Sequence, residues 1–162
     1  SSALNTLTGQ KALARTSKTP GRTQSINVFP LDEERRLIDL PGYGYAKVPE
    51  RVRAHWREAL PRYLNERASL HGLVVIMDVR RALTEHDAQM LEWCLQAGLP
   101  AHVLLTKADK LKRGPALQAL QRLQGILDRD YPQTTASLFS AAKGTGVDAL
   151  HDRLDEWLFD KT

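Results

Sequence analysis

The chain has 162 residues, a length that suits one domain with a hydrophobic core of its own. Hydrophobic residues make up 42% and charged residues 26%, which is ordinary for a soluble globular protein. No apolar run approaches the length of a membrane span, and the single cysteine, Cys94, excludes a disulfide framework. We therefore expect one cytoplasmic domain over residues 1–162, with no membrane partner.

The net charge of +4 is unevenly distributed along the chain. Residues 11–62 contain eleven Lys and Arg against six Asp and Glu, whereas residues 63–162 contain twelve basic and thirteen acidic residues. Such a basic segment forms either an ordinary solvated surface or a face that meets phosphate polyanions.

The first part of the chain predicts a helix, a loop and a hairpin. Apolar residues at helical spacing indicate a helix over residues 1–7, and turn-forming residues indicate a loop over 16–24. Alternating residues over 24–30 and 34–39, with Asp32-Glu33-Glu34 between them, predict an antiparallel β-hairpin.

Helices and strands alternate in the rest of the chain. The patterns predict helices at 51–67, 84–97, 115–129 and 146–159, and strands at 73–77, 101–105 and 137–139. Thr84 and Asp87 form a capping box, and the continuous apolar run at 73–77 is typical of a strand covered on both faces. The alternation predicts an α/β fold: a mostly parallel twisted sheet with helices on both faces and the hairpin as an antiparallel edge.

Asp39-Leu40-Pro41-Gly42 follows the second hairpin strand. A carboxylate at a strand end can hold a water molecule of a magnesium ion, and the N–H of a following glycine can approach a terminal phosphate closely. The same four residues also suit a plain turn.

Two further polar segments follow predicted strands. Thr106-Lys107-Ala108-Asp109 could read guanine, because Asp109 can accept two hydrogen bonds from one edge of the base while the Lys107 stem lies over the purine face. The turn Ser140-Ala141-Ala142 offers backbone N–H groups to the guanine carbonyl. The structural alternative for Asp109 is an N-cap, or an ion pair with Lys110 or Lys112.

Together these motifs resemble the bacterial EngB (YihA/YsxC) family, GTP-binding proteins of the translation-factor-related P-loop GTPase class. The stretches that carry the resemblance are ARTSKTPGRTQSIN, DLPGYGYAKV, TKADK and FSAAKGTG. The resemblance covers essentially the whole chain, and it implies a role in large ribosomal subunit assembly, linked to cell division and septation.

The resemblance also implies roles for single residues. Ser1, Thr23 and Asp39 are expected to bind Mg²⁺, Asp39 through water. The residues expected to contact GTP or GDP are Ser1, Gly21, Arg22, Thr23, Gln24, Ser25, Asp39, Leu40, Pro41, Gly42, Thr106, Lys107, Ala108, Asp109, Phe139, Ser140 and Ala141.

Two features depart from the usual GTPase pattern. The phosphate-binding pattern G-x-x-x-x-G-K-[ST] is absent, and Ser1 corresponds to its last residue. We therefore expect the sequence to be a segment of a longer protein that includes this loop and the strand before it. Tyr43 stands where many GTPases have a glutamine that orients water, so we expect slow hydrolysis. We assign no catalytic base and expect His55 and His86 on solvent-facing helix positions.

The sequence thus predicts a slow, magnesium-dependent GTPase switch whose basic 11–62 region meets ribosomal RNA. One alternative is a nucleotide-independent RNA-binding or scaffold protein on a degenerate GTPase fold, against which Thr23, Asp39, Gly42, Lys107 and Asp109 argue. Another is an ATP-using P-loop enzyme, against which the Lys107 and Asp109 pair argues.

Overall fold

The computed structural model describes residues 27–39 and 49–159, and it divides the chain into two units, Ser1–Arg62 and Tyr63–Thr162.

The first unit contains the predicted hairpin, whose second strand begins two residues later than predicted. Strand β1 (Asn27–Pro30) pairs antiparallel with β2 (Arg36–Asp39), and the two form a sheet of their own among the described residues. The predicted turn is confirmed. The carboxylate of Asp32 accepts hydrogen bonds from the backbone N–H groups of Glu34 and Arg35, both at 2.8 Å, and thereby closes the turn.

Helix α2 (Glu50–Glu66) begins where the sequence predicts and has the expected apolar stripe. Trp56, Leu60 and Leu64 of this stripe are buried. Glu50 in the first turn forms ion pairs with Arg53 and Arg57, where its negative charge also suits the helix dipole.

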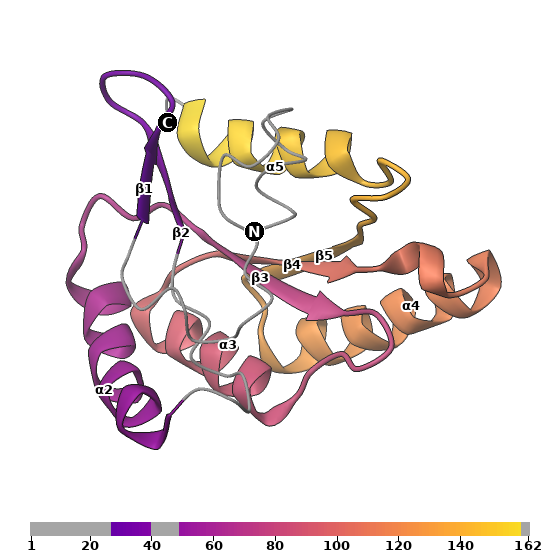
Figure 1. Ribbon diagram of the computed structural model, residues 1–162, viewed down its shortest axis with the longest axis horizontal. Coiled ribbons are helices and arrows are strands. Elements are labelled where there is room, and N and C mark those ends of the chain that lie inside the picture. The colour runs from indigo at the N-terminus through magenta and orange to yellow at the C-terminus, as the bar shows by residue number, and fades with distance from the viewer. Residues whose placement is uncertain (1–26, 40–48, 160–162) are drawn as a thin grey trace. The chain divides into compact units, whose positions relative to one another are not determined.

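The second unit is built on a parallel sheet with strand order β3–β4–β5 (Figure 1). The strands are β3 (Leu73–Asp78), β4 (Ala101–Thr106) and β5 (Thr134–Leu138). The last strand begins earlier than predicted. Thr134 and Thr135 are β-branched residues that pair with the start of β4, although they are not apolar.

Helices cover both faces of this sheet, as predicted. Helices α3 (Glu85–Ala97) and α4 (Arg113–Asp130) lie on one face and α5 (Val147–Phe159) on the other (Figure 1). The Thr84 capping box of α3 is present with both of its hydrogen bonds. Between α5 and β3, a Cβ atom at Gly72 would overlap the Trp157 ring, so the absence of a side chain there permits close packing.

The main core lies between the sheet and helices α3 and α4. Val75 and Met77 of β3 and Val103 and Leu105 of β4 point into it. Cys94 is buried in the same core, and burial raises the pKa of its thiol to about 12. The prediction of Cys94 as a small buried hydrophobe is confirmed.

The expectation that the strand at 73–77 is covered on both faces is wrong for the described part of the chain. Ile76 is 49% exposed, whereas Leu104 on the same face of the neighbouring strand is fully buried. The reason is position in the sheet, because β4 lies between two strands and β3 lies at one side of the three.

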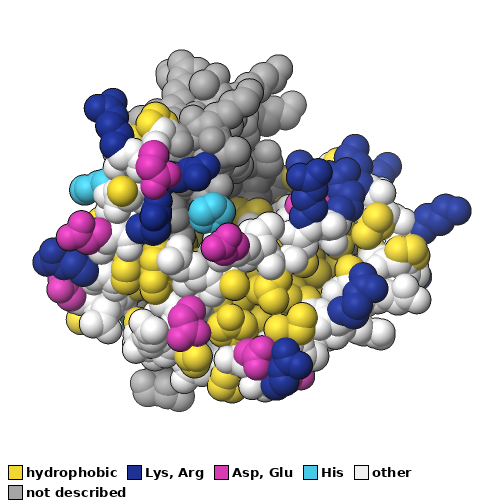
Figure 2. All heavy atoms as spheres, turned by 90° about the horizontal axis from the view of Figure 1, so that it is seen from below, with side chains coloured by type: hydrophobic (Ala, Val, Ile, Leu, Met, Phe, Trp, Pro, Cys, Tyr) yellow, Lys and Arg dark blue, Asp and Glu magenta, His cyan; other side chains and the backbone are white. Residues whose placement is uncertain are grey.

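Hydrophobic side chains also reach the surface of the face that carries α3 and α4, where they gather near the middle (Figure 2). Leu95 of α3 and Leu117 of α4 are the exposed large hydrophobic residues of these two helices. No described helix is long and apolar enough to cross a membrane.

His102 is a buried polar residue near the start of the mostly apolar strand β4. Its Nδ1 lies 2.7 Å from the Thr135 hydroxyl and its Nε2 lies 2.9 Å from the Ser137 hydroxyl, so both ring nitrogens have partners on β5. Burial, helped by the nearby charge of Arg153, lowers the pKa of His102 to about 4. The imidazole is therefore neutral in the folded protein at neutral pH.

We predict that His102 makes the protein less stable in mild acid. Its pKa falls from 6.5 in the unfolded chain to about 4 in the fold, so the unfolded chain binds more protons between these values. The free energy of unfolding should fall as the pH drops through this window, by at most about 3 kcal/mol from this residue. Urea unfolding at a series of pH values measures the effect.

His102→Gln should remove this part of the pH dependence, because an amide can both donate and accept but does not titrate. His71→Gln, which changes an exposed histidine, is the matched control and should behave like the wild type. Equal pH dependence in His102→Gln and the wild type would contradict the assignment.

Candidate functional site

The two polar segments predicted to contact guanine meet at the carboxyl ends of β4 and β5. The N–H of Phe139 donates to the Leu105 carbonyl at 2.8 Å, and the N–H of Ala108 donates to the Phe139 carbonyl at 3.1 Å. These bonds continue the parallel pairing of β4 and β5 past the strand ends. The structure therefore brings Thr106–Asp109 and Phe139–Ala141 together, as the site prediction requires.

Ser140 fixes the orientation of the Asp109 carboxylate. Its fully buried hydroxyl donates to Asp109 Oδ1 at 2.7 Å and accepts from the N–H of Lys143 at 3.1 Å. This hydrogen bond is the main reason that the pKa of Asp109 lies below its ordinary value, with further contributions from Lys110 and Lys143. An exposed, ionised and oriented carboxylate can accept hydrogen bonds from a ligand.

The structural alternatives for Asp109 do not hold in the described residues. Asp109 lies within the short 3₁₀ helix η1 (Ala108–Lys110), whose N-cap is Lys107, and the N-cap of α4 is Lys112. The side-chain partner of Asp109 is Ser140.

The loop after Phe139 folds back on itself. The N–H of Ser140 donates to the Thr145 carbonyl at 3.0 Å, and the two residues form an isolated antiparallel bridge. Gly146 has φ of 78°, and a Cβ atom there would collide with the Leu138 carbonyl. Glycine is thus required by both the backbone conformation and the close approach.

Thr106 contacts the neighbouring strand. Its hydroxyl donates to the Met77 carbonyl at 3.1 Å and so links the ends of β3 and β4. The next residue, Lys107, adopts a left-handed backbone conformation with φ of 58°, which is uncommon outside glycine and asparagine. Its side chain is 60% exposed.

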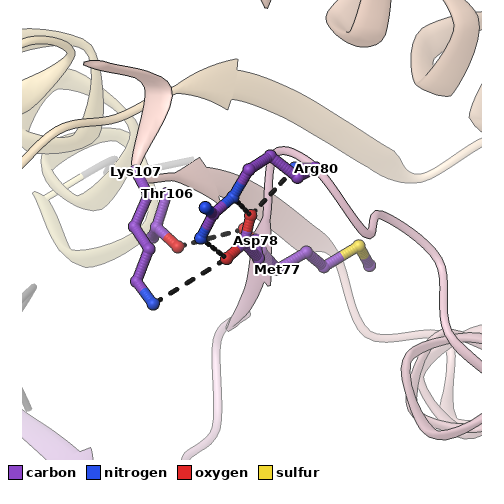
Figure 3. A network of polar contacts seen from close by, with 5 residues as sticks. All are labelled: Met77, Asp78, Arg80, Thr106 and Lys107. Atoms are coloured by element: carbon purple, nitrogen blue, oxygen red, sulfur yellow. Dashed lines mark hydrogen bonds and ion pairs between the residues drawn. The ribbon is translucent and has the colours of Figure 1, made fainter. Parts of the chain in front are cut away.

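A carboxylate beside Lys107 was not predicted from the sequence. Asp78 ends β3, and both of its oxygens accept hydrogen bonds from the Arg80 guanidinium, at 3.0 and 2.8 Å (Figure 3). Lys107 Nζ lies 3.8 Å from Asp78 Oδ2 (Figure 3). Asp78 could have been predicted from the sequence, because it directly follows the predicted strand at 73–77. The same feature, an aspartate after a strand, singled out Asp39.

A pocket with a volume of about 470 Å³ lies at this point and is lined by Asp78, Arg80, Arg81 and Lys107. Its size is within the range of small-molecule sites. Three cations and one carboxylate suit a polar, anionic ligand better than an apolar one.

Most of the residues predicted to bind phosphate or metal lie outside the described residues, as does Tyr43. They are Ser1, Gly21, Arg22, Thr23, Gln24, Ser25, Leu40, Pro41 and Gly42. For Asp39 the structure describes the backbone alone. Asp39 is the last residue of β2 and pairs with Asn27 of β1. Within residues 27–39 and 49–159, no group of three His, Cys, Asp or Glu could hold a metal ion. His55 is exposed as expected, whereas His86 is half-buried and thus less solvent-facing than expected.

Comparison with known proteins identifies the family. The family model of the 50S ribosome-binding GTPases matches residues 1–107. A protein of Nitrosococcus oceani named "Probable GTP-binding protein EngB" is 56% identical over 158 residues, which cover 98% of this chain and 79% of the relative. The chain belongs to the EngB family of GTPases.

Other relatives agree with this assignment. An EngB protein of Edwardsiella ictaluri is 51% identical over 162 residues, which cover all of this chain and 75% of that protein. A crystal structure of a probable GTP-binding protein EngB superposes with a TM-score of 0.75 at 20% identity and covers 99% of this chain and 93% of that one. The predicted α/β fold of a P-loop GTPase is therefore confirmed.

We predict that Ser140→Ala raises the pKa of Asp109 toward its ordinary value, because the variant lacks the strongest hydrogen bond to the carboxylate. An NMR titration of the aspartate carboxyl carbons measures this change. Ser137→Ala is the control, since the Ser137 hydroxyl contacts His102 and not Asp109. An unchanged Asp109 titration in Ser140→Ala would show that the hydroxyl does not stabilise the charge.

Proposed function

We propose that this EngB-family chain binds GTP and GDP and slowly hydrolyses GTP, as a molecular switch. The observation that supports the proposal best is the Asp109 carboxylate, held by the buried Ser140 hydroxyl beside Lys107 at the carboxyl end of the sheet. Doubly wound α/β proteins bind their ligands at this end of the strands.

Guanine suits this arrangement chemically. Asp109 would accept hydrogen bonds from the N1–H and the 2-amino group of the base, and the Lys107 stem would cover its face. The backbone N–H groups of Ala141 and Ala142 would donate to the guanine carbonyl, whereas the N–H of Ser140 already donates to Thr145. Adenine has neither an N1 proton nor a 2-amino group, so it would leave the carboxylate unpaired.

The phosphates and the metal ion would be held by the other predicted residues. The hydroxyl oxygens of Ser1 and Thr23 and the carboxylate of Asp39 are the oxygen donors that Mg²⁺ prefers. The ion would neutralise charge on the terminal phosphates when bound. Gly42 would offer its N–H to the γ-phosphate, and the loop residues Gly21, Arg22, Gln24 and Ser25 would flank Thr23 along the nucleotide. Tyr43 in place of a glutamine supports slow turnover without a stimulating partner.

The proposed partner is the large ribosomal subunit or its precursor, in the cytoplasm, with a link to cell division and septation. The matching family model, described as a 50S ribosome-binding GTPase, supports the ribosomal partner. The basic 11–62 segment supports contact with RNA. In its described part, Arg51, Arg57 and Arg62 of α2 are exposed.

We predict that Asp109→Asn changes the base preference. The amide replaces one acceptor oxygen with a donor, which suits xanthine, because xanthine has a carbonyl at position 2. GDP binding should weaken by roughly 10- to 100-fold or more, and binding of xanthosine diphosphate should strengthen. Calorimetric titrations of the wild type and the variant with both nucleotides measure the effect.

Asp128→Asn is the control, since it removes an exposed carboxylate on α4 and should leave both affinities unchanged. An Asp109→Asn variant that still prefers GDP would mean that Asp109 does not read the base.

We predict that ribosomal binding through the 11–62 segment is electrostatic. The double variant Lys47→Glu and Arg51→Glu should weaken binding to the large subunit. It should also flatten the plot of log K against log salt by about 0.7–0.9 for each phosphate that the protein no longer neutralises. Arg122→Glu with Arg129→Glu changes the net charge equally on α4 and is the control. Equal salt dependence in both double variants would place the interface elsewhere.

A further inference from the structure

The carboxylate of Asp78 is held in one orientation by three hydrogen bonds from a single residue. Asp78 Oδ1 accepts from the backbone N–H of Arg80 at 2.9 Å and from Arg80 Nε at 3.0 Å, and Oδ2 accepts from Arg80 Nη2 at 2.8 Å. The Asp78 side chain is only 26% exposed, and Arg80 lowers the pKa of Asp78 to about 2. The group therefore stays charged at physiological pH and does not rotate freely.

The Lys107 ammonium group is attracted by this carboxylate but is not hydrogen-bonded to it. The 3.8 Å from Lys107 Nζ to Asp78 Oδ2 is an ion-pair distance that is too long for a direct hydrogen bond. The ammonium group thus keeps its three N–H donors available for a ligand. Both side chains line the same pocket.

Asp78 is the only carboxylate among the described residues that line this pocket, and its neighbours there are Arg80, Arg81 and Lys107. Without it, two guanidinium groups would repel the ammonium of Lys107. The long lysine side chain would then lose its preferred position and gain conformational freedom.

We propose that Asp78, oriented by Arg80, positions Lys107 for the guanine nucleotide. The inference rests on the proposed function, and it assigns a positioning residue on β3 to a site otherwise formed by the segments after β4 and β5. Asp78 contributes to affinity by holding Lys107 over the base. The choice of base remains with Asp109, since the purine face that Lys107 covers is common to all purines.

The test is a double-mutant cycle on the full chain, with GDP titrated calorimetrically. Asp78→Asn should weaken GDP binding by about two- to five-fold at low salt, as expected for a partly exposed ion pair, and by less at high salt. In a Lys107→Ala background the same change should cause no further loss, because Asp78 acts through Lys107. Asp78→Glu retains the charge and should recover most of the affinity.

The chain offers a matched control. Asp130 forms the same two-pronged pair with Arg129, at 3.0 and 3.1 Å, on the last turn of α4. Asp130→Asn therefore removes an equivalent carboxylate–guanidinium pair that forms no ion pair with a lysine in the described part of the chain, and should leave GDP affinity unchanged. Asp78→Ser is a second neutral variant in case Asp78→Asn does not fold, and thermal unfolding checks both.

The outcomes separate this inference from the proposed function. Wild-type chain that binds GDP no better than ADP would overturn the proposed function itself. If the wild type prefers GDP, the inference is overturned when Asp78→Asn binds like the wild type, or when its loss persists in Lys107→Ala. It is also overturned when both neutral Asp78 variants fail to fold, since Asp78 is then structural. A ratio of GDP to xanthosine diphosphate affinity that stays constant in Asp78→Asn supports it.

Discussion

The central position of β4 is the constraint on which the second unit depends. This strand pairs with β3 on one edge and β5 on the other, and Val103, Leu104 and Leu105 are fully buried. Burial of both faces and pairing of both edges fix the strand in register. Because all three strands run parallel, the chain must leave them at the same edge of the sheet, where their polar segments meet.

The site then follows from hydrogen bonds that extend the ladder beyond the strands. Phe139 continues the pairing of β5 with Leu105 and also accepts from Ala108, so the two loops share a backbone connection. The buried hydroxyl of Ser140 is thereby placed next to Asp109. An exposed carboxylate gains a defined orientation from a buried partner, which limits the conformational freedom that a ligand must otherwise restrict.

The two carboxylates of the site, Asp78 and Asp109, are stabilised in different ways. Asp78 is paired with the Arg80 guanidinium, whereas Asp109 is oriented by a neutral hydroxyl. A carboxylate paired with a cation has little capacity left for a ligand, but it can set the electrostatic environment of its neighbours. A carboxylate oriented by a hydroxyl keeps acceptor capacity. These differences support the assignment of positioning to Asp78 and of base recognition to Asp109.

The sequence by itself determined the order of the elements, the class of the fold and the main residues of the candidate site. Apolar periodicity and capping signals are local, so the hairpin, helix α3 with its Thr84 cap and the strand at 101–105 could all be predicted from neighbouring residues. The motif residues Lys107, Asp109 and Ser140 were recognisable because each follows a strand.

Only the tertiary structure decided which residues become partners across the sheet. Thr134 and Thr135 belong to β5 because the backbone of β4 pairs with them. This pairing depends on a distant strand, so the residues next to Thr134 and Thr135 in the sequence do not predict it. Ile76 is exposed because β3 lies at one side of the described strands. The 3.8 Å between Asp78 and Lys107 depends on strand register, which places Asp78 opposite Thr106. Such contacts join residues far apart in the chain. Burial and strand pairing therefore determine them, and the local sequence cannot predict them.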